Sequence, residues 1–391
     1  MSKCPICGGG RHVELDRRSP IPVLQNRVWP DLQSARAAPT GALRMLFCLD
    51  CEFAWNADFD AARDIYDPAY DNDQMQSDVF KAHVEAMAAR IVAAGAAAPA
   101  GAKPSLVEVG CGQGGFLAML DSGRTFSALV GYDPAWRGGA SGSDRVRIVG
   151  SYFEGARAGS SEPRADFFVS RHTIEHVPDP IGFLTCIRQG IADHPHARLF
   201  LETPDILWIL ENGQIQDLFY EHCSIFSPRA LETALARTGF EPIAVHTVFD
   251  GQYLWAEARP GVASVIEAPT EDRAALASKF RDHRAAFVGA WRARLSQAAA
   301  HGPVWIWGAS SKGVTFTLLV DPEAEHLTGA IDINPKKIGQ CLPLSGLRIS
   351  APANIEDGAT IVLMNPNYER EIRDMLDALG KKADVLTLAD L

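Results

Sequence analysis

The chain has 391 residues, of which 47% are hydrophobic and 22% are charged. This composition excludes a disordered, collagen-like or coiled-coil protein, and the length predicts two or three domains. The net charge of −11 disfavours general nucleic-acid binding. We find no apolar run of the ~18 residues that span a membrane and no secretory signal, so we expect a cytoplasmic protein.

Four cysteines near the N-terminus form the first candidate site. Cys4 and Cys7 make one C-x-x-C pair, and Cys48 and Cys51 make another. Four thiolates complete a tetrahedral Zn²⁺ site and leave no open position, so the spacing predicts a structural zinc module over residues 1–58. A chance pair of motifs is the alternative. A redox pair is disfavoured because neither motif lies at a βαβ turn.

The rest of the chain is predicted to form two α/β units. Residues 59–104 carry apolar side chains at helical spacing, and strand-like and helix-like segments then alternate up to residue 258. This alternation indicates a parallel, doubly wound sheet in a core of residues 59–260. A linker helix is expected within 261–300, and a second α/β domain over 301–391. The predicted strands are residues 106–109, 126–132, 167–170, 199–202, 304–307, 330–333 and 361–364.

A glycine-rich turn follows the first of these strands. Glu108 ends the strand, and Gly110, Cys111, Gly112 and Gly114 lead into a helix whose N–H groups can approach a ligand. Asp133 ends the next strand, where an acid can bind both ribose hydroxyls of a nucleoside. The combination resembles motif I of class I S-adenosylmethionine-dependent methyltransferases. A Rossmann-type oxidoreductase is the alternative, but its glycine spacing is G-x-G-x-x-G.

Ligands of open α/β sheets bind beyond the carboxyl ends of the strands. The donor site is therefore expected to include residues that follow the second and third strands of the core: Pro134, Ser170, Arg171 and His172. His172, Glu175 and His176 cluster there as candidate catalytic or substrate-binding groups, since histidine is the usual general base. Alternatively, Glu175 and His176 cap the following helix.

A second turn of this kind follows the strand at residues 304–307. Gly308, Ser310 and Ser311 lead into a helix, Lys312 adds a positive charge, and Asp332 ends the next strand. Such a turn presents N–H groups to an anion, so the diphosphate of a nucleotide-linked substrate is the predicted ligand. The alternative is a domain used only for packing or dimerisation.

Over nearly its full length the chain resembles three-domain sugar C-methyltransferases that act on nucleotide-linked 4-keto deoxysugars. The resemblance rests on the cysteine module, the donor turn with Asp133, the run Tyr220-Glu221-His222, and two C-terminal blocks that begin at Trp307 and Asp332. It implies an α/β protein with a class I methyltransferase sheet, an N-terminal zinc module and a C-terminal Rossmann-like domain. The implied cofactors are S-adenosylmethionine and structural Zn²⁺.

The resemblance also implies roles for individual residues. His222 matches the base that removes a proton next to the ketone, and His176 matches a second active-site histidine. Glu221 and Tyr220 fall in the same signature, and the tyrosine that covers the pocket is Tyr70 or Tyr66. One position departs from the family, because Phe219 replaces the first signature tyrosine and cannot donate a hydrogen bond.

Two reactions therefore remain open. The first is C-methylation of a nucleotide-linked keto sugar through an enolate. The second is O- or N-methylation of another small metabolite, which depends mainly on alignment and less on a base. A metal-dependent binding module without activity would explain neither the donor turn nor the histidines. We expect a small-molecule substrate, no nucleic-acid or membrane partner, and a monomer or homodimer.

Overall fold

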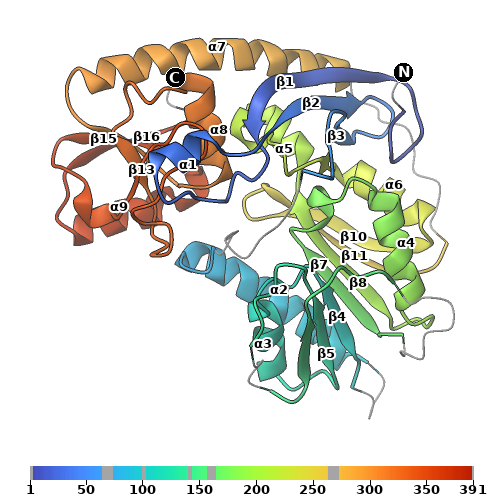
Figure 1. Cartoon of the computed structure of the whole chain (residues 1–391). Coiled ribbons are helices and arrows are strands. Elements are labelled where there is room, and N and C mark those ends of the chain that lie inside the picture. Colours follow the sequence, from blue (N-terminus) through green and yellow to red (C-terminus); the bar gives the residue numbers. More distant parts are fainter. Residues whose placement is uncertain are drawn as a thin grey trace.

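The computed structural model describes residues 3–63, 74–98, 103–139, 143–155, 164–262 and 273–389. These residues form three β-sheets with helices packed around them (Figure 1). No helix in the described ranges is long and apolar enough to cross a membrane.

The central sheet has seven strands in the order β10-β11-β8-β7-β4-β5-β6. Five of them run parallel, which the alternating sequence pattern predicted, but β11 is antiparallel to both β8 and β10. The predicted parallel sheet is thus confirmed, and the structure adds an antiparallel edge where a tight turn joins β10 to β11 and no crossover helix is needed. The strands are β4 (Leu106–Val109), β5 (Leu129–Tyr132), β6 (Val146–Val149), β7 (Phe167–Arg171), β8 (Arg198–Pro204), β10 (Phe240–Val248) and β11 (Tyr253–Pro260).

Helices cover both faces of this sheet. α2 (Asp78–Ala96) and α3 (Gly115–Ser122) pack on one face, and α4 (Pro180–Gly190) and α6 (Pro228–Arg237) pack on the other. The sequence predicted a helix somewhere within 59–104, but the helix starts only at Asp78. The Ser77 side chain fixes this start, because it accepts a hydrogen bond from the N–H of Phe80.

The N-terminal sheet is built mostly from the first 58 residues. Its order is β1-β2-β3-β9, and all pairs are antiparallel. The strands are β1 (His12–Pro22), β2 (Thr40–Cys48), β3 (Ala54–Asn56) and β9 (Ser224–Ile225), and the short helix α1 (Leu32–Arg36) lies between β1 and β2. The last strand comes from far along the chain. The N-terminal sheet is thus completed by a strand that begins two residues after the predicted base, His222.

The C-terminal sheet has five parallel strands in the order β14-β13-β12-β15-β16. Its strands are β12 (Val304–Trp307), β13 (Gly329–Ile331), β14 (Ile349–Ser350), β15 (Ala359–Leu363) and β16 (Ala383–Thr387). Its helices are α8 (Ser311–Val320), α9 (Glu369–Ala378) and the short turns η3 (Pro352–Asn354) and η4 (Pro366–Tyr368). The sequence placed three of these strands to within two residues.

The helix α7 (Arg273–Ala299) does more than link two domains. It runs along the top of Figure 1 from the N-terminal sheet to the C-terminal sheet. Its buried side chains, including Phe287 and Trp291, belong to one hydrophobic cluster with β1, α5 (Ile206–Glu211), α8 and β12. This shared core holds the N-terminal and C-terminal sheets in one arrangement.

Predicted strand boundaries differ from the structure mainly at residues 126–132. The strand β5 starts only at Leu129, although Phe126 is fully buried. Phe126 lies in the preceding loop and packs against Phe167, so its apolar character reflects burial and not strand pairing.

Candidate active site

The predicted donor turn joins β4 to α3. Gly110 and Gly114 have φ angles of +80° and +81°, which are strained for any residue with a Cβ atom. A Cβ atom at Gly110 would also collide with the side chain of Thr173. Gly110 therefore lets the turn approach the segment after β7, whereas Gly114 lies against Ile148 of β6. The turn leads directly into the N-terminus of α3.

Asp133 lies next to this turn. One of its carboxylate oxygens accepts from the N–H of Gly112 at 2.8 Å, and the other accepts from the N–H of Ala135 at 2.8 Å. Each oxygen keeps a further lone pair for a ligand hydroxyl. The carboxylate is thus held in a fixed orientation beside the donor turn, while Pro134 lies exposed at the rim.

Glu108 is a buried acid below the turn. Burial raises the pKa of its carboxyl to about 8, and the nearby Arg171 opposes this shift. The guanidinium of Arg171 lies over the ring of Phe116 and donates to Glu202 at 2.6 Å. Cys111 is buried in the turn, and Ser170 donates to the carbonyl of Val109 at 3.1 Å.

Glu202 connects the donor turn to the histidines. Its fully buried carboxylate also contacts the imidazole of His83 on α2 and lies 3.8 Å from Nε2 of His172. Burial alone would raise the pKa of Glu202, but Arg171 and His172 hold it well below the ordinary value. His172 has a left-handed backbone with φ of +49°, and its N–H donates to the carbonyl of Glu202.

His172, Glu175 and His176 follow β7, and the last two lie in η1 (Ile174–His176). Nδ1 of His172 is 3.4 Å from Oε1 of Glu175, whose other oxygen accepts from Thr203 at 3.1 Å. Glu175 and His176 do not cap α4, because the N-cap of that helix is Asp179.

His222 approaches the same place from a distant segment. Its ring and that of His176 have centroids 4.9 Å apart. Burial lowers the pKa of His222 well below its ordinary value, and His176 acts in the same direction. Burial also lowers the pKa of His176, against the pull of Glu175. Both rings are therefore neutral imidazoles near pH 7.

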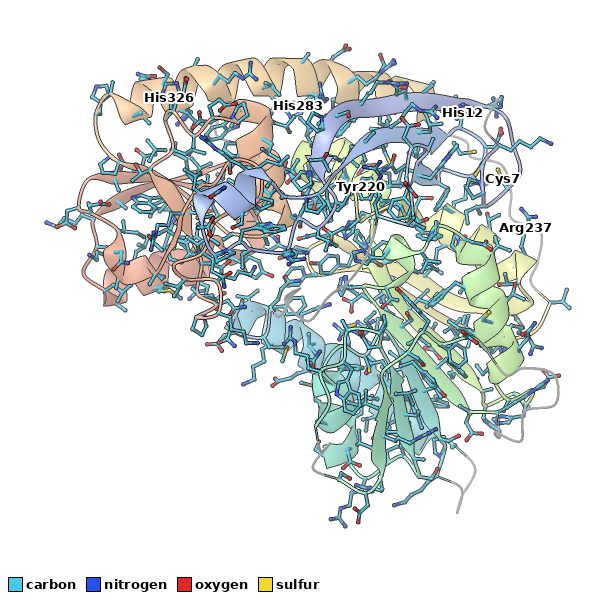
Figure 2. All side chains as sticks on the ribbon, in the orientation of Figure 1. Cys7, His12, Tyr220, Arg237, His283 and His326 are labelled. Carbon is cyan, nitrogen blue, oxygen red and sulfur yellow. The ribbon has the colours of Figure 1, made fainter. Side chains whose placement is uncertain are left out.

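The other signature residues occupy different positions. The hydroxyl of Tyr220 donates to the carbonyl of Asp60 at 3.0 Å and accepts from its N–H at 2.9 Å. Tyr220 is fully buried below the N-terminal strands (Figure 2), and Glu221 accepts from the N–H of Gln25 at 2.5 Å. Phe219, the residue before Tyr220, does line the pocket. The centroid of its ring lies 3.9 Å from the centroid of the His222 ring.

The C-terminal turn repeats the geometry of the donor turn. Gly308 has a φ of +117°, and α8 begins directly after Ser310. Asp332 accepts from the N–H of Ala309 at 3.1 Å, just as Asp133 accepts from Gly112. In both places a carboxylate from one strand end holds the turn that follows a neighbouring strand.

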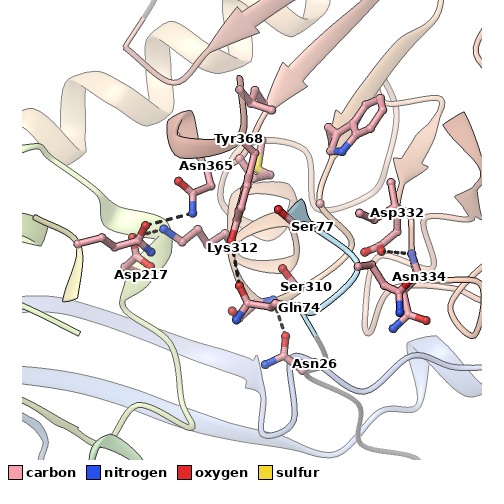
Figure 3. Close-up of a pocket in the computed structure, with 18 of the residues that line it drawn as sticks. Asn26, Gln74, Ser77, Asp217, Ser310, Lys312, Asp332, Asn334, Asn365 and Tyr368 are labelled. Atoms are coloured by element: carbon pink, nitrogen blue, oxygen red, sulfur yellow. Dashed lines mark hydrogen bonds and ion pairs between the residues drawn. The ribbon is translucent and has the colours of Figure 1, made fainter. Parts of the chain in front are cut away.

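Two groups predicted to bind an anion at this turn already have protein partners. The ammonium of Lys312 pairs with Asp217 at 2.9 Å, and the N–H of Ser311 donates to Asn26 at 3.1 Å (Figure 3). Burial raises the pKa of Asp217, while Lys312 lowers it. Asp217 ends η2 (Ile215–Asp217), so this ion pair connects the C-terminal domain to the segment that carries His222.

One cavity contains both the predicted catalytic histidines and the predicted anion-binding turn of the C-terminal domain. It is lined by His172, Glu175, His176 and His222 from the central domain. From the C-terminal domain it is lined by Gly308, Ser310, Ser311, Lys312 and Asp332. Figure 3 shows Asn26 and Ser77 entering the cavity from two further elements. The predicted catalytic histidines and the predicted anion site thus face a common space.

The four N-terminal cysteines also converge. Their Sγ atoms all lie within 4.8 Å of one another, with Cys4 to Cys51 at 3.5 Å and Cys7 to Cys48 at 3.6 Å. A tetrahedral site with Zn–S bonds of ~2.3 Å places sulfurs ~3.8 Å apart. The N–H groups of Gly9 and Asp50 donate to Cys7 and Cys48. This donor set fits Zn²⁺, and Cys7 marks its place at the edge of the molecule (Figure 2).

Comparison with known proteins identifies the family. Residues 76–245 match the model of a methyltransferase domain, and residues 259–385 match that of a C-methyltransferase C-terminal domain. The chain therefore joins a methyltransferase domain to a C-methyltransferase C-terminal domain. It is an S-adenosylmethionine-dependent enzyme with a class I methyltransferase fold, a cysteine cluster and a C-terminal α/β domain.

Several named proteins are similar to this chain. This chain is 26% identical over 290 residues to the C-methyltransferase NovU of Streptomyces niveus. The match covers 69% of this chain and 68% of NovU. Among solved structures, the dimethyltransferase RosA of Streptomyces davawensis is 25% identical with a TM-score of 0.34 and covers 41% of this chain. The match spans half of the RosA chain. A methyltransferase of Mesorhizobium loti is 14% identical with a TM-score of 0.35, covering 45% of this chain and 97% of that one.

Sequence reasoning about this C-methyltransferase missed several residues of the cavity. Asn26 and Asp217 gave no motif signal. Glu202 does not line the cavity but pairs with Arg171, and it could have been noticed as an acid at the end of a predicted strand. Tyr70 and Tyr66, the candidates for the covering tyrosine, lie outside the described residues.

Proposed function

We propose that this C-methyltransferase methylates a carbon next to a ketone in a small molecule linked to a nucleoside diphosphate, of which a keto deoxysugar is the expected kind. The observation that carries the proposal is the shared cavity, because it joins a cluster of imidazoles to an anion-binding turn. NovU, to which the chain is related, is named a C-methyltransferase.

The proposed reaction begins with the loss of a proton from the carbon next to the ketone. An imidazole of the pocket accepts this proton, and His222 is the first candidate by sequence, followed by His176 and His172. The enolate carbon then attacks the methyl group of the donor sulfonium, and S-adenosylhomocysteine leaves. The neutral state of the buried rings suits them to accept a proton.

The nucleotide end of the substrate is proposed to bind the C-terminal turn. The N-terminus of α8 favours a phosphate, although the N–H of Ser311 already donates to Asn26. Asp332 stands where Asp133 stands in the donor site. Lys312 supplies positive charge only in part, because Asp217 already neutralises it. The four cysteines are proposed to hold a structural Zn²⁺, and the protein is proposed to be a monomer or a homodimer.

Thermal melting tests this proposal. S-adenosylhomocysteine is added first, followed by TDP, UDP, GDP or CDP in turn. A ligand at ~100 times its dissociation constant stabilises the folded protein by ~2.7 kcal/mol. We expect one diphosphate to raise the melting temperature in a saturable manner, and Asp332→Ala to weaken that response but keep the response to S-adenosylhomocysteine. Asp133→Ala is the matched control, because it should weaken the response to S-adenosylhomocysteine and keep the response to the diphosphate.

A response to S-adenosylhomocysteine alone would contradict the nucleotide-linked substrate. The search would then turn to O- and N-nucleophiles. If a diphosphate does bind, the matching keto compound is incubated with S-adenosylhomocysteine in D₂O. Deuterium uptake at the carbon next to the ketone is expected for C-methylation, and an intact C–H bond would contradict enolate formation.

A further inference from the structure

A second cavity lies where the helix α7 runs beside strand β1 (Figure 1), at the C-terminal end of α8. It shares no lining residue with the active-site cavity, which lies at the N-terminal end of α8. Its volume is about 530 Å³, which is within the usual size of a small-molecule site. No carboxylate of the described residues lines it, and its charged lining consists of Arg17, Arg18, Arg284 and Arg292.

Two of these arginines share one carboxylate. Nε of Arg18 lies 2.6 Å from Oδ2 of Asp16, and Nε of Arg284 lies 2.6 Å from Oδ1. Burial lowers the pKa of Arg18, Asp16 opposes this shift, and the nearby Arg284 adds to it. The buried Nε–H of Arg284 makes no hydrogen bond within the described part of the chain. The single carboxylate of Asp16 therefore balances only one of the two guanidinium charges.

The other two arginines differ in their partners. Arg17 pairs with Glu14, whose carboxylate lies 2.7 Å from its Nη2 atom. Arg292 donates to the carbonyl of Leu319 at 3.0 Å and pairs with no carboxylate among the described residues. Four guanidiniums and two carboxylates thus leave two positive charges at this cavity, although the whole protein has a net charge of −11.

Apolar side chains form much of the remaining wall. They include Ile21 on β1, Val288 on α7 and Leu319 on α8. An apolar wall with a few convergent polar groups is typical of a site for an organic molecule. A phosphomonoester carries a charge of about −1.5 to −2 at pH 7, and guanidinium groups bind its oxygens through paired N–H donors. Such a ligand matches both the surplus charge and the apolar wall.

We propose that the cavity between β1, α7 and α8 binds a small organic phosphomonoester. Its phosphate lies beside Arg18 and Arg284, Arg292 adds positive charge, and its organic part lies on the apolar wall. This site is separate from the active site and does not rest on the proposed function. Arg18 also donates to the carbonyl of Leu218, four residues before His222. A test of the site therefore leaves Arg18 unchanged, because its loss would disturb the catalytic segment.

Calorimetric titration of the full-length protein with phenyl phosphate tests the site, with NaCl added to keep the ionic strength constant. We expect saturable binding that is tighter than the binding of inorganic phosphate, which cannot use the apolar wall. Arg284→Met should weaken it at least about tenfold, the effect of losing one charge-assisted hydrogen bond. Arg292→Met should weaken it less. Arg281→Met removes an exposed arginine of the same helix outside the cavity, so this matched control should keep the dissociation constant.

An unchanged melting response to S-adenosylhomocysteine shows that each variant is folded. The proposal would be overturned by a titration without saturable binding, or by equal dissociation constants for phenyl phosphate and inorganic phosphate. It would also be overturned if Arg281→Met weakened binding as much as Arg284→Met. Binding that Asp332→Ala removes and Arg284→Met retains would assign the ligand to the C-terminal turn instead. Because the two substitutions separate the two sites, this proposal and the proposed function fail separately.

Discussion

The ammonium of Lys312 lies 2.9 Å from a carboxylate oxygen of Asp217, and both side chains are largely buried. Lys312 lies in the first turn of α8, whereas Asp217 ends the turn η2, five residues before His222. Figure 3 shows the two side chains pointing toward each other in the cavity wall. The ion pair therefore links the position of the C-terminal domain to that of the catalytic segment.

Lys312→Met is expected to lower the free energy of unfolding by ~3 kcal/mol, because it leaves a buried carboxylate unpaired. Burial already raises the pKa of Asp217, and loss of Lys312 would raise it further. Below this pKa the carboxyl is protonated and neutral, so the loss should be larger at pH 8 than at pH 5. Urea unfolding at both pH values measures this loss of unfolding free energy. Asp217→Asn together with Lys312→Met should recover most of the loss, and a double variant as unstable as Lys312→Met would contradict this account.

Donor binding is expected to depend on the protonation of Glu108. Burial raises the pKa of this carboxyl to about 8, so it is mostly protonated at pH 7 in the absence of ligand. The positive charges of S-adenosylmethionine favour the carboxylate and lower that pKa. Binding at pH 7 should therefore release a proton, and affinity should rise as the pH increases toward 8.

Calorimetry in two buffers of different ionisation enthalpy counts the released protons. Glu108→Gln cannot ionise, so it should abolish both the proton release and the pH dependence. If this variant keeps the same pH dependence, another group is responsible.

Asp133→Ala is expected to weaken the binding of S-adenosylhomocysteine by ~1–3 kcal/mol, since charge-assisted hydrogen bonds to the ligand are lost. The substitution also removes the acceptor of the Gly112 and Ala135 N–H groups. Direct titration gives the dissociation constant. Asp332→Ala is the control, because it removes the equivalent acid of the other domain. An unchanged constant for Asp133→Ala would exclude this residue from the donor site.

Tyr220→Phe should leave the turnover rate nearly unchanged but lower the stability by ~1 kcal/mol, the usual value of one hydrogen bond. The structure directs its hydroxyl to the backbone of Asp60, and the residue does not line the described cavity. Steady-state kinetics and thermal melting test this expectation. A large fall in kcat at unchanged stability would return Tyr220 to the catalytic role that the family signature implies.

Cys51→Ser is expected to loosen both the cysteine module and the catalytic segment. β3 begins three residues after Cys51 and pairs with β9, which begins two residues after His222. We expect a melting temperature lower by about 5 °C or more, the shift that a loss of ~2 kcal/mol causes. Hydrogen exchange should rise at residues 224–225. Cys186→Ser, which alters a cysteine outside the cluster, is the control. Unchanged exchange at β9 would show that the module is uncoupled from the pocket.

The sequence by itself determined the local features of this protein. The Gly110–Gly114 turn, the acid at Asp133 and their counterparts at Gly308 and Asp332 could all be predicted, because short glycine-rich turns after buried strands depend on nearby residues. The two C-x-x-C pairs predicted a cluster of four thiolates for the same reason. The matches to the two family models confirm the methyltransferase assignment.

Only the tertiary structure decided which of these parts meet. Asp217 and Lys312 are 95 residues apart in sequence, and His176 and His222 lie on separate segments, so their contacts depend on packing across the sheets. The antiparallel edge of the central sheet and the addition of β9 to the N-terminal sheet are also long-range pairings. A side chain's type specifies what it can bind. Which residue it meets depends on how the domains pack, and that packing is fixed by the buried core that α7 shares with the N-terminal and C-terminal sheets.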